Sequence, residues 1–143
     1  MTIFLIHGAA TWMMIGLIWF VQVVHYPMFA RVGRAGFPAY EQIHQQRTTW
    51  VVLPAMTIEL GTGLWLLIQP PEGMPGAWLL INAAGLAGIW GSTFLLQVPQ
   101  HRRLGAGFDR EAHLRLLRSN WIRTALWSGR GVLLLVLVLN AHA

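Results

Sequence analysis

Two oppositely charged residues stand inside apolar stretches of this chain. Glu59 lies nine residues after Trp50, and Arg130 lies within Thr124–Leu139. A buried carboxylate beside a guanidinium can transfer a proton or stabilise an anion in a reaction. The same pair can also simply fix the register of two helices. Because either charge alone is costly in hydrocarbon, we expect Glu59 and Arg130 to pair.

Four histidines form a second group with chemical potential. His25, His44, His101 and His113 all fall near the same ends of the apolar stretches, and imidazole is a ligand that suits iron, copper and zinc. We predict that these four bind a metal, or that they are solvated interfacial residues. For a cofactor the predicted contacts are His25, His44, Gln97 and Trp127. Haem, a transition metal and cofactor-free chemistry all remain open, whereas the absence of cysteine excludes thiolate ligands.

Composition indicates which elements must hold these residues. Of 143 residues, 55% are hydrophobic and only 10% are charged, which is too apolar for a soluble domain of this size. Four blocks are long enough to span a bilayer: Ile3–Val24, Trp50–Ile68, Trp78–Val98 and Thr124–Leu139. With the start of the last helix included, we place the spans at 3–24, 50–68, 78–98 and 120–139. The sequence predicts an all-α integral membrane four-helix bundle, with residues 1–143 forming one domain.

The basic residues set the predicted orientation. All ten are arginines, and nine of them lie between the first and second blocks or between the third and fourth. The positive-inside rule then places both basic loops in the cytoplasm and both termini outside. We expect a multi-pass protein of a bacterial inner membrane. Because the arginines flank membrane spans, we expect no nucleic-acid partner.

Local signals suggest where helices begin and end. A short interfacial helix should start at Ala39 and run into the second span, with a kink near Pro54. Pro27 should end or kink the first span, and Pro99 should end the third, before a flexible joint over residues 102–107. Asp109 can cap the last helix, whose first half is a basic, amphipathic, cytoplasmic extension. No internal repeat stands out.

Helical periodicity gives each span one polar face. On the last helix that face carries His113, Leu116, Asn120, Arg123, Trp127 and Arg130. Lipid cannot satisfy such groups, so the four polar faces should meet inside the bundle. We predict Glu59, Arg123, Arg130 and Asn120 as the catalytic set.

Two short stretches resemble a known family. The third span ends in Pro99-Gln100-His101-Arg102-Arg103-Leu104, and Asn120-Trp121-Ile122-Arg123 precedes the last span. Together with the four-span layout, these residues resemble the anthrone-oxygenase-like family of small membrane proteins. The resemblance implies oxidation of a lipophilic substrate in the membrane, a reaction that such proteins can carry out without a cofactor, with Asn120 and Arg123 as the residues that carry over.

A second likeness is to the membrane protoporphyrinogen oxidase family, which is associated with haem. His7, Pro54-Ala55-Met56 and Gly63-Leu64-Trp65-Leu66-Leu67 are similar to its first two helices. The third helix differs, because Trp78 is followed by Asn82 where that family has a lysine.

These observations lead to one expected function and one alternative. We expect a membrane oxidoreductase that acts on a flat, lipophilic small molecule in a pocket lined by His, Arg and Glu. The alternative is a non-catalytic membrane subunit or carrier whose polar seam specifies helix assembly. The expected partners are the lipid bilayer, a lipophilic small molecule and a second copy of the chain.

Overall fold

The computed structural model describes residues 1–140, which are helical apart from short loops. Its elements are α1 (Thr2–Phe20), the π-helix η1 (Val21–His25), α2 (Tyr26–Met28), the 3₁₀-helix η2 (Phe29–Arg31), α3 (Phe37–Ile68), α4 (Gly76–Ser92), the π-helix η3 (Thr93–Gln97), α5 (Val98–Gly105) and α6 (Arg110–Asn140). Four continuous runs, Thr2–Arg31, Phe37–Ile68, Gly76–Gly105 and Arg110–Leu139, are long and apolar enough to cross a membrane. The predicted all-α membrane four-helix bundle is confirmed.

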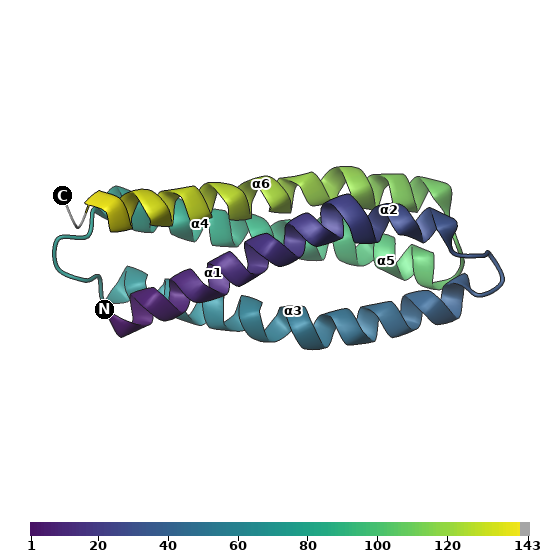
Figure 1. Ribbon diagram of the computed structural model, residues 1–143, viewed down its shortest axis with the longest axis horizontal. Coiled ribbons are helices and arrows are strands. Elements are labelled where there is room, and N and C mark those ends of the chain that lie inside the picture. Colours follow the sequence, from purple (N-terminus) through teal and green to yellow (C-terminus); the bar gives the residue numbers. More distant parts are fainter. Residues whose placement is uncertain (141–143) are drawn as a thin grey trace.

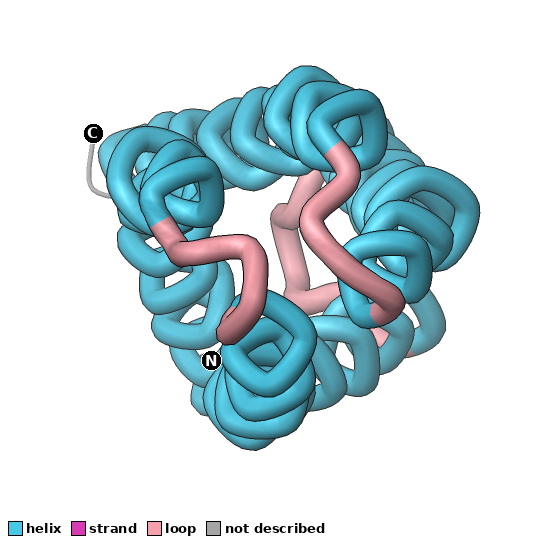
Figure 2. The backbone as a smooth tube through the Cα atoms, turned by 90° about the vertical axis from the view of Figure 1, so that its right-hand side faces the viewer, coloured by secondary structure: helices cyan, strands magenta, loops and turns pink. Residues whose placement is uncertain are grey.

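The four runs pass back and forth along one axis (Figure 1) and stand at the corners of a square when viewed down it (Figure 2). The loops at 32–36 and 106–109 lie together at one end, which we call the basic end because arginines flank both loops. The turn at 69–75, with its three prolines, lies at the opposite end, beside the start of α1 and the end of α6. We call this the proline end.

The helices are longer than the predicted spans. The four runs contain 30 to 32 residues each, or about 45 Å at 1.5 Å per residue, whereas the hydrocarbon core is about 30 Å thick. The excess lies mainly at the basic end. There the predicted interfacial helix and the second span are one helix, α3, which continues through Pro54, and α6 contains the predicted extension. Residues near the basic end therefore belong to rigid helices rather than to loops.

Proline does not end the first and third runs, so the prediction that Pro99 terminates a helix is wrong. Each proline is preceded by a π-helical turn, and the chain stays helical past Pro27 to Arg31 and past Pro99 to Gly105. Proline lacks an N–H and its ring clashes with the carbonyl four residues earlier. A wider turn just before it accommodates both defects. The two π-turns end at His25 and Gln97. The position of these two residues therefore depends on the π-turns rather than on a regular α-helix.

The joint before the last helix is shorter than expected, because α5 includes Arg102 to Gly105 and only residues 106–109 are non-helical. The predicted cap is confirmed: Asp109 Oδ1 accepts the backbone N–H of Glu111 at 2.8 Å and that of Ala112 at 3.1 Å. Its Oδ2 accepts a hydrogen bond from Arg103 at 2.5 Å. The capped start of α6 is thus tied to the end of α5.

Comparison of the two halves shows a repeat that hydropathy alone did not reveal. The first half has a π-turn, Pro27, Arg31-Val32-Gly33, Ala35-Gly36-Phe37 and Arg47-Thr48-Thr49-Trp50. The second half has, in the same order, a π-turn, Pro99, Arg103-Leu104-Gly105, Ala106-Gly107-Phe108 and Arg118-Ser119-Asn120-Trp121. Glu59 stands nine residues after the tryptophan of the first half and Arg130 nine after that of the second. The molecule therefore consists of two similar helical hairpins, and these two charges occupy equivalent positions.

The predicted polar face of α6 points into the bundle, since all six of its residues are at most 7% exposed. Large apolar side chains instead cover the outside, among them Trp50, Ile68, Leu95 and Val132, each at least 60% exposed. Such an outside suits lipid, and the structure is that of a multi-pass membrane protein.

Candidate functional site

The polar interior divides into two groups, and the first surrounds Glu59. We call Glu59, Arg130, His7, Asn82, Thr11, Thr62 and Trp127 the Glu59 network. Arg130 Nη1 lies 2.5 Å from Glu59 Oε1, as the sequence predicted, and both side chains are buried. Thr11 donates to the same oxygen at 2.7 Å, and Trp127 Nε1 donates to Oε2 at 3.0 Å. Both carboxylate oxygens are therefore satisfied.

The rest of the Glu59 network completes the hydrogen bonding of Arg130. Its Nε donates to Asn82 Oδ1 at 2.9 Å, and its Nη2 donates to His7 Nε2 at 3.1 Å. Because Nε2 accepts, the proton of His7 sits on Nδ1 and points to Thr62 Oγ1 at 2.9 Å. No side-chain atom of this network is both buried and unpaired among the described residues. The network is a closed, saturated unit.

The second group lies nearer the basic end, where Glu41 and His44 on α3 face His101 on α5. One ligand atom from each of the three lies within 4.8 Å of the other two, and we call these residues the Glu41 cluster. Glu41 Oε1 is 2.6 Å from His101 Nδ1 and accepts from Gln45 Nε2 at 3.1 Å. Its Oε2 is buried without a hydrogen-bond partner in residues 1–140.

Further side chains hold the two histidine rings of the cluster. His101 Nε2 is 3.0 Å from the Tyr26 hydroxyl, and Gln45 Nε2 also donates to the His101 backbone carbonyl at 3.2 Å. His44 Nδ1 lies 2.8 Å from His25 Nε2 and 3.0 Å from Thr48 Oγ1. Hydrogen bonds of this kind orient metal-binding imidazoles in known sites.

The four predicted metal-binding histidines are therefore only partly brought together. His44 and His101 belong to the Glu41 cluster, and His25 contacts His44. His113 lies apart from them: its Nε2 donates to the Tyr26 backbone carbonyl at 2.8 Å, and its ring stacks on Phe29. Glu41 was missed by sequence reasoning, although it precedes His44 by three residues, the Glu-x-x-His spacing that carboxylate-bridged metal proteins use.

The residues present suit a single metal ion better than haem. Two histidines and one carboxylate with open positions form the facial triad of non-haem iron enzymes, and zinc takes similar sets. An unpaired, buried carboxylate oxygen is what a cation would satisfy. A haem held by His25 and His44 would need to lie between their rings, but those rings are hydrogen-bonded to each other, with centroids 4.6 Å apart.

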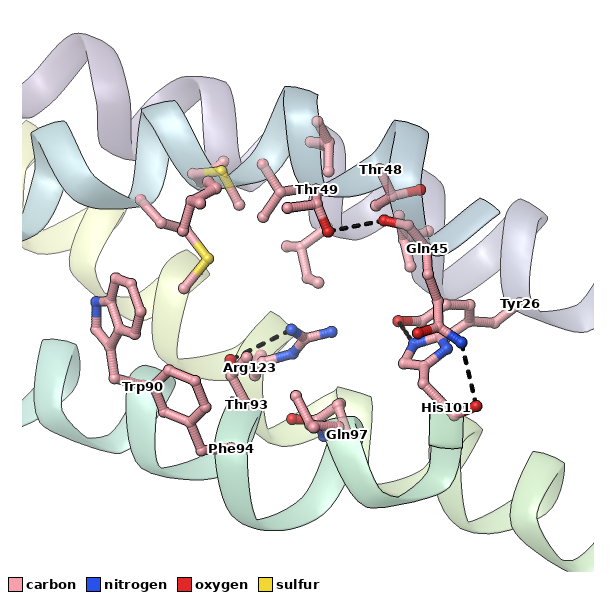
Figure 3. Close-up of a pocket in the computed structure, with 18 of the residues that line it drawn as sticks. Tyr26, Gln45, Thr48, Thr49, Trp90, Thr93, Phe94, Gln97, His101 and Arg123 are labelled. Carbon is pink, nitrogen blue, oxygen red and sulfur yellow. Dashed lines mark hydrogen bonds between the residues drawn. The ribbon is translucent and has the colours of Figure 1, made fainter. Parts of the chain in front are cut away.

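A cavity of about 270 Å³ adjoins the Glu41 cluster, between α3 and the η3–α5 segment. Its walls are mainly apolar and include Met14, Met56, Trp90 and Phe94. Polar groups also line it, and Figure 3 shows many of them: Tyr26, Gln45, Thr48, Thr49, Thr93, Gln97, His101 and Arg123. His44 and Arg102 complete the polar lining. Leu53 on one wall is 45% exposed and Phe94 on the other is 59% exposed. The cavity is therefore open at the outer surface of the bundle.

The remaining predicted site residues lie at or behind this cavity. Gln97 and Trp127 line it, as does Arg123. Asn120 lies behind Arg123: its Oδ1 accepts from Arg123 Nε at 3.0 Å and Nη2 at 2.5 Å, and its Nδ2 donates to Gln22 at 2.8 Å. Thr93 Oγ1 accepts from Arg123 Nη1 at 3.3 Å. Of the predicted catalytic set, Arg123 thus lines the cavity with Asn120 behind it, and Glu59 and Arg130 belong to the closed network.

No protein-family model, curated protein or solved structure matches this chain.

Proposed function

We propose that this protein is a metal-dependent membrane oxidoreductase that oxidises a flat, lipophilic small molecule. The observation that carries the proposal is the Glu41 cluster: two histidines and a carboxylate with an unpaired buried oxygen, beside a mainly apolar cavity open at the outer surface of the bundle. The resemblance of Pro99–Leu104 and Asn120–Arg123 to the anthrone-oxygenase-like family supports oxidation of a lipophilic substrate but does not require a metal.

The first step is entry of the substrate from the bilayer. Leu53 and Phe94 flank the opening, and Trp90 and Phe94, whose rings are 5.6 Å apart, offer flat surfaces for an aromatic ring. A ligand that partitions into lipid reaches such an opening without crossing water. The cavity lies close to the lower end of the usual range for small-molecule sites, about 300 Å³, so a compact ring system fits best.

The second step is oxidation beside the Glu41 cluster. A bound first-row metal would supply the redox chemistry and the reaction with dioxygen that such a triad supports. In the net reaction, a hydroquinone loses two electrons and two protons, and dioxygen takes up both to become hydrogen peroxide. Gln45 and Tyr26 orient the cluster. The His25–His44 pair, hydrogen-bonded to each other, can take up a proton from the hydroquinone and return it to the forming peroxide.

Oxygen uptake tests this proposal. The purified protein is loaded with Fe²⁺ without oxygen and then given oxygen and a decyl-tailed benzohydroquinone. We expect uptake of oxygen and formation of hydrogen peroxide, both lost in Glu41→Gln and His101→Ala. His113→Ala should retain them, since His113 lies outside the cluster. A rate that is the same with and without metal, or the same in Glu41→Gln, would contradict the proposal.

The second candidate function is a non-catalytic membrane subunit. The closed Glu59 network favours it, because a saturated polar seam specifies how helices assemble without needing a ligand. If the protein binds no metal and oxidises no hydroquinone, this function accounts for the molecule better.

A further inference from the structure

Arg123 is a buried cation that has no acidic partner in residues 1–140. It is 7% exposed, and its guanidinium donates to neutral oxygens, among them those of Asn120 and Thr93. The ring of Trp127 lies 6.0 Å from its Cζ. Glu59 pairs with Arg130, and Glu41 contacts His101 through one oxygen; no ion pair joins either carboxylate to Arg123 in these residues. Arg130, by contrast, has its carboxylate.

An unpaired guanidinium at this depth is costly. Arginine stays protonated in proteins, so it cannot escape the cost by losing its charge. A buried charge is normally paired or faces a polar cavity, and an intramembrane arginine that does neither costs at least a few kcal/mol. Arg123 lines the cavity, and Figure 3 shows it reaching toward the cavity centre from beside Thr93. The occupant of the cavity can supply the missing negative charge.

The walls determine what else the occupant must be. Around Arg123 the cavity is lined by apolar side chains, including Met14, Met56, Trp90 and Phe94, and by neutral polar ones, among them Thr49, Thr93 and Gln97. An anion with a polar body would leave these walls unsatisfied, and a neutral apolar ligand would leave the guanidinium unpaired. An amphiphilic acid answers both requirements. The volume of about 270 Å³ favours a small one.

We propose that the cavity binds a small lipophilic aromatic acid as its anion, with the ionised oxygen on Arg123 and the rings between Trp90, Phe94 and the methionines. This inference deepens the proposed function, because it names the class of substrate that the same cavity would take. It requires no metal. Binding and oxidation can therefore be tested separately.

The test compares a charged ligand with its neutral twin. The acidic 2-hydroxy-1,4-naphthoquinone is ionised at pH 7, whereas 2-methoxy-1,4-naphthoquinone has the same rings and no charge. Affinities are measured by tryptophan fluorescence quenching and by calorimetry, in neutral detergent with EDTA. A charge-assisted hydrogen bond in a buried site should make the anion bind about 10- to 100-fold more tightly.

Variants of Arg123 then locate the charge that the ligand meets. Arg123→Gln should reduce the affinity for the anion to that for the methoxy compound, and Arg123→Lys should keep part of the preference. Arg118→Gln is the matched control, because it removes one positive charge from an exposed position on the same helix. It should leave both affinities unchanged. If Arg123→Gln does not fold, Thr93→Val is the second variant, because it removes one acceptor that orients the guanidinium. It should lower the affinity for the anion and leave that for the methoxy compound unchanged.

Three outcomes would overturn the inference. Equal affinities for the two naphthoquinones would show that the cavity does not recognise charge. An equal loss in Arg118→Gln would show that only the general positive field matters. A phospholipid that stays bound to the wild-type protein in native mass spectrometry, and is lost in Arg123→Gln, would identify a lipid headgroup as the partner of Arg123.

The same measurement in Glu41→Gln separates this inference from the proposed function. If Glu41→Gln still prefers the anion while the wild-type protein oxidises no hydroquinone, the binding site stands and the oxidoreductase does not. If oxidation occurs without any preference for the anion, the proposed oxidoreductase stands and the anion-binding site does not.

Discussion

The Glu59 network and the Glu41 cluster contain similar side chains but treat them differently. Each has a buried glutamate on α3 and histidine contacts, and each joins helices from both halves of the chain. Around Glu59 both oxygens are paired, and the adjacent arginine has its counter-ion. Around Glu41 one oxygen is unpaired, and the neighbouring cavity contains an arginine without an acidic partner in the described chain.

This difference distinguishes intramembrane charges with a structural role from those that are available to bind a ligand. The expense of a buried ionisable group argues for some purpose, but it does not say which. A saturated network has fulfilled its purpose when the helices are assembled. Unpaired groups beside a cavity remain available to something that is not part of the chain. Glu59 and Arg130, the most conspicuous charges in the sequence, therefore fall on the structural side.

The largest predicted effect concerns the closed network. Glu59→Gln or Arg130→Met alone leaves one buried charge without its partner, at a cost of about 3–5 kcal/mol. The double variant should be more stable than the sum of the two losses implies, because no orphan charge remains. Unfolding in detergent, followed by tryptophan fluorescence, measures all three. Strictly additive losses would show that the two residues do not act as a pair. The Glu59 network would then not differ from the Glu41 cluster in the way described above.

A smaller effect is expected when a methyl group is added next to Arg130, at Gly85. A Cβ on Gly85 would lie 2.7 Å from Arg130 Cδ, and the guanidinium cannot retreat because Glu59, Asn82 and His7 hold it. Gly85→Ala should cost about 1–3 kcal/mol, as overpacking usually does. Gly91→Ala, on the same helix with nothing within 4 Å of the new Cβ, is the control. Equal melting temperatures for the two variants would show that the network tolerates displacement.

The Glu41 cluster should be much less sensitive when no metal is present. Glu41→Gln removes a carboxylate that is only half satisfied, so we expect the metal-free protein to change in stability by less than about 1 kcal/mol. Thermal unfolding in EDTA compares this variant with Glu59→Gln. A loss as large as that of Glu59→Gln would place Glu41 among the structural charges and remove the contrast between the two groups.

The smallest effect is expected at an exposed pair that lies outside both groups. The N–H of Ala112 and the Arg103 guanidinium lower the pKa of Asp109 below its ordinary value of 3.8. A lowered carboxyl pKa stabilises the folded protein above the unfolded pKa, and the contribution is lost as pH falls through the folded value. The melting temperature of the wild type should therefore fall below about pH 4 by slightly more than that of Asp109→Asn. Parallel pH profiles would contradict this assignment.

Much of the fold could be predicted from the sequence because hydropathy and helical periodicity are local signals. They gave four spans, the inward face of α6 and the pairing of Glu59 with Arg130, since unsatisfied charge in hydrocarbon leaves few alternatives. They did not predict that the chain stays helical past Pro27 and Pro99. A π-turn depends on packing around the proline and leaves no hydropathy signal.

The candidate site was harder to predict than the fold. Glu41 lies outside the predicted second span, where a carboxylate is not unusual. Its approach to His101 also depends on α5 continuing past Pro99, which the sequence did not predict. His113 has the same residue type and similar depth as His101, yet its ring faces Phe29 and the Tyr26 carbonyl. Only the rotation of each helix about its axis distinguishes the two. The orientation of the bundle in the membrane stays a prediction.

Metal content after loading tests the central distinction most directly. Wild type, Glu41→Gln and the Glu59→Gln/Arg130→Met double variant are each incubated with Fe²⁺ or Zn²⁺, desalted and analysed by mass spectrometry for bound metal. We predict about one ion per chain, as in mononuclear triads, in the wild type and in the double variant, and none in Glu41→Gln. Retention of the metal in Glu41→Gln together with its loss in the double variant would show that the roles of the two regions have been assigned the wrong way round.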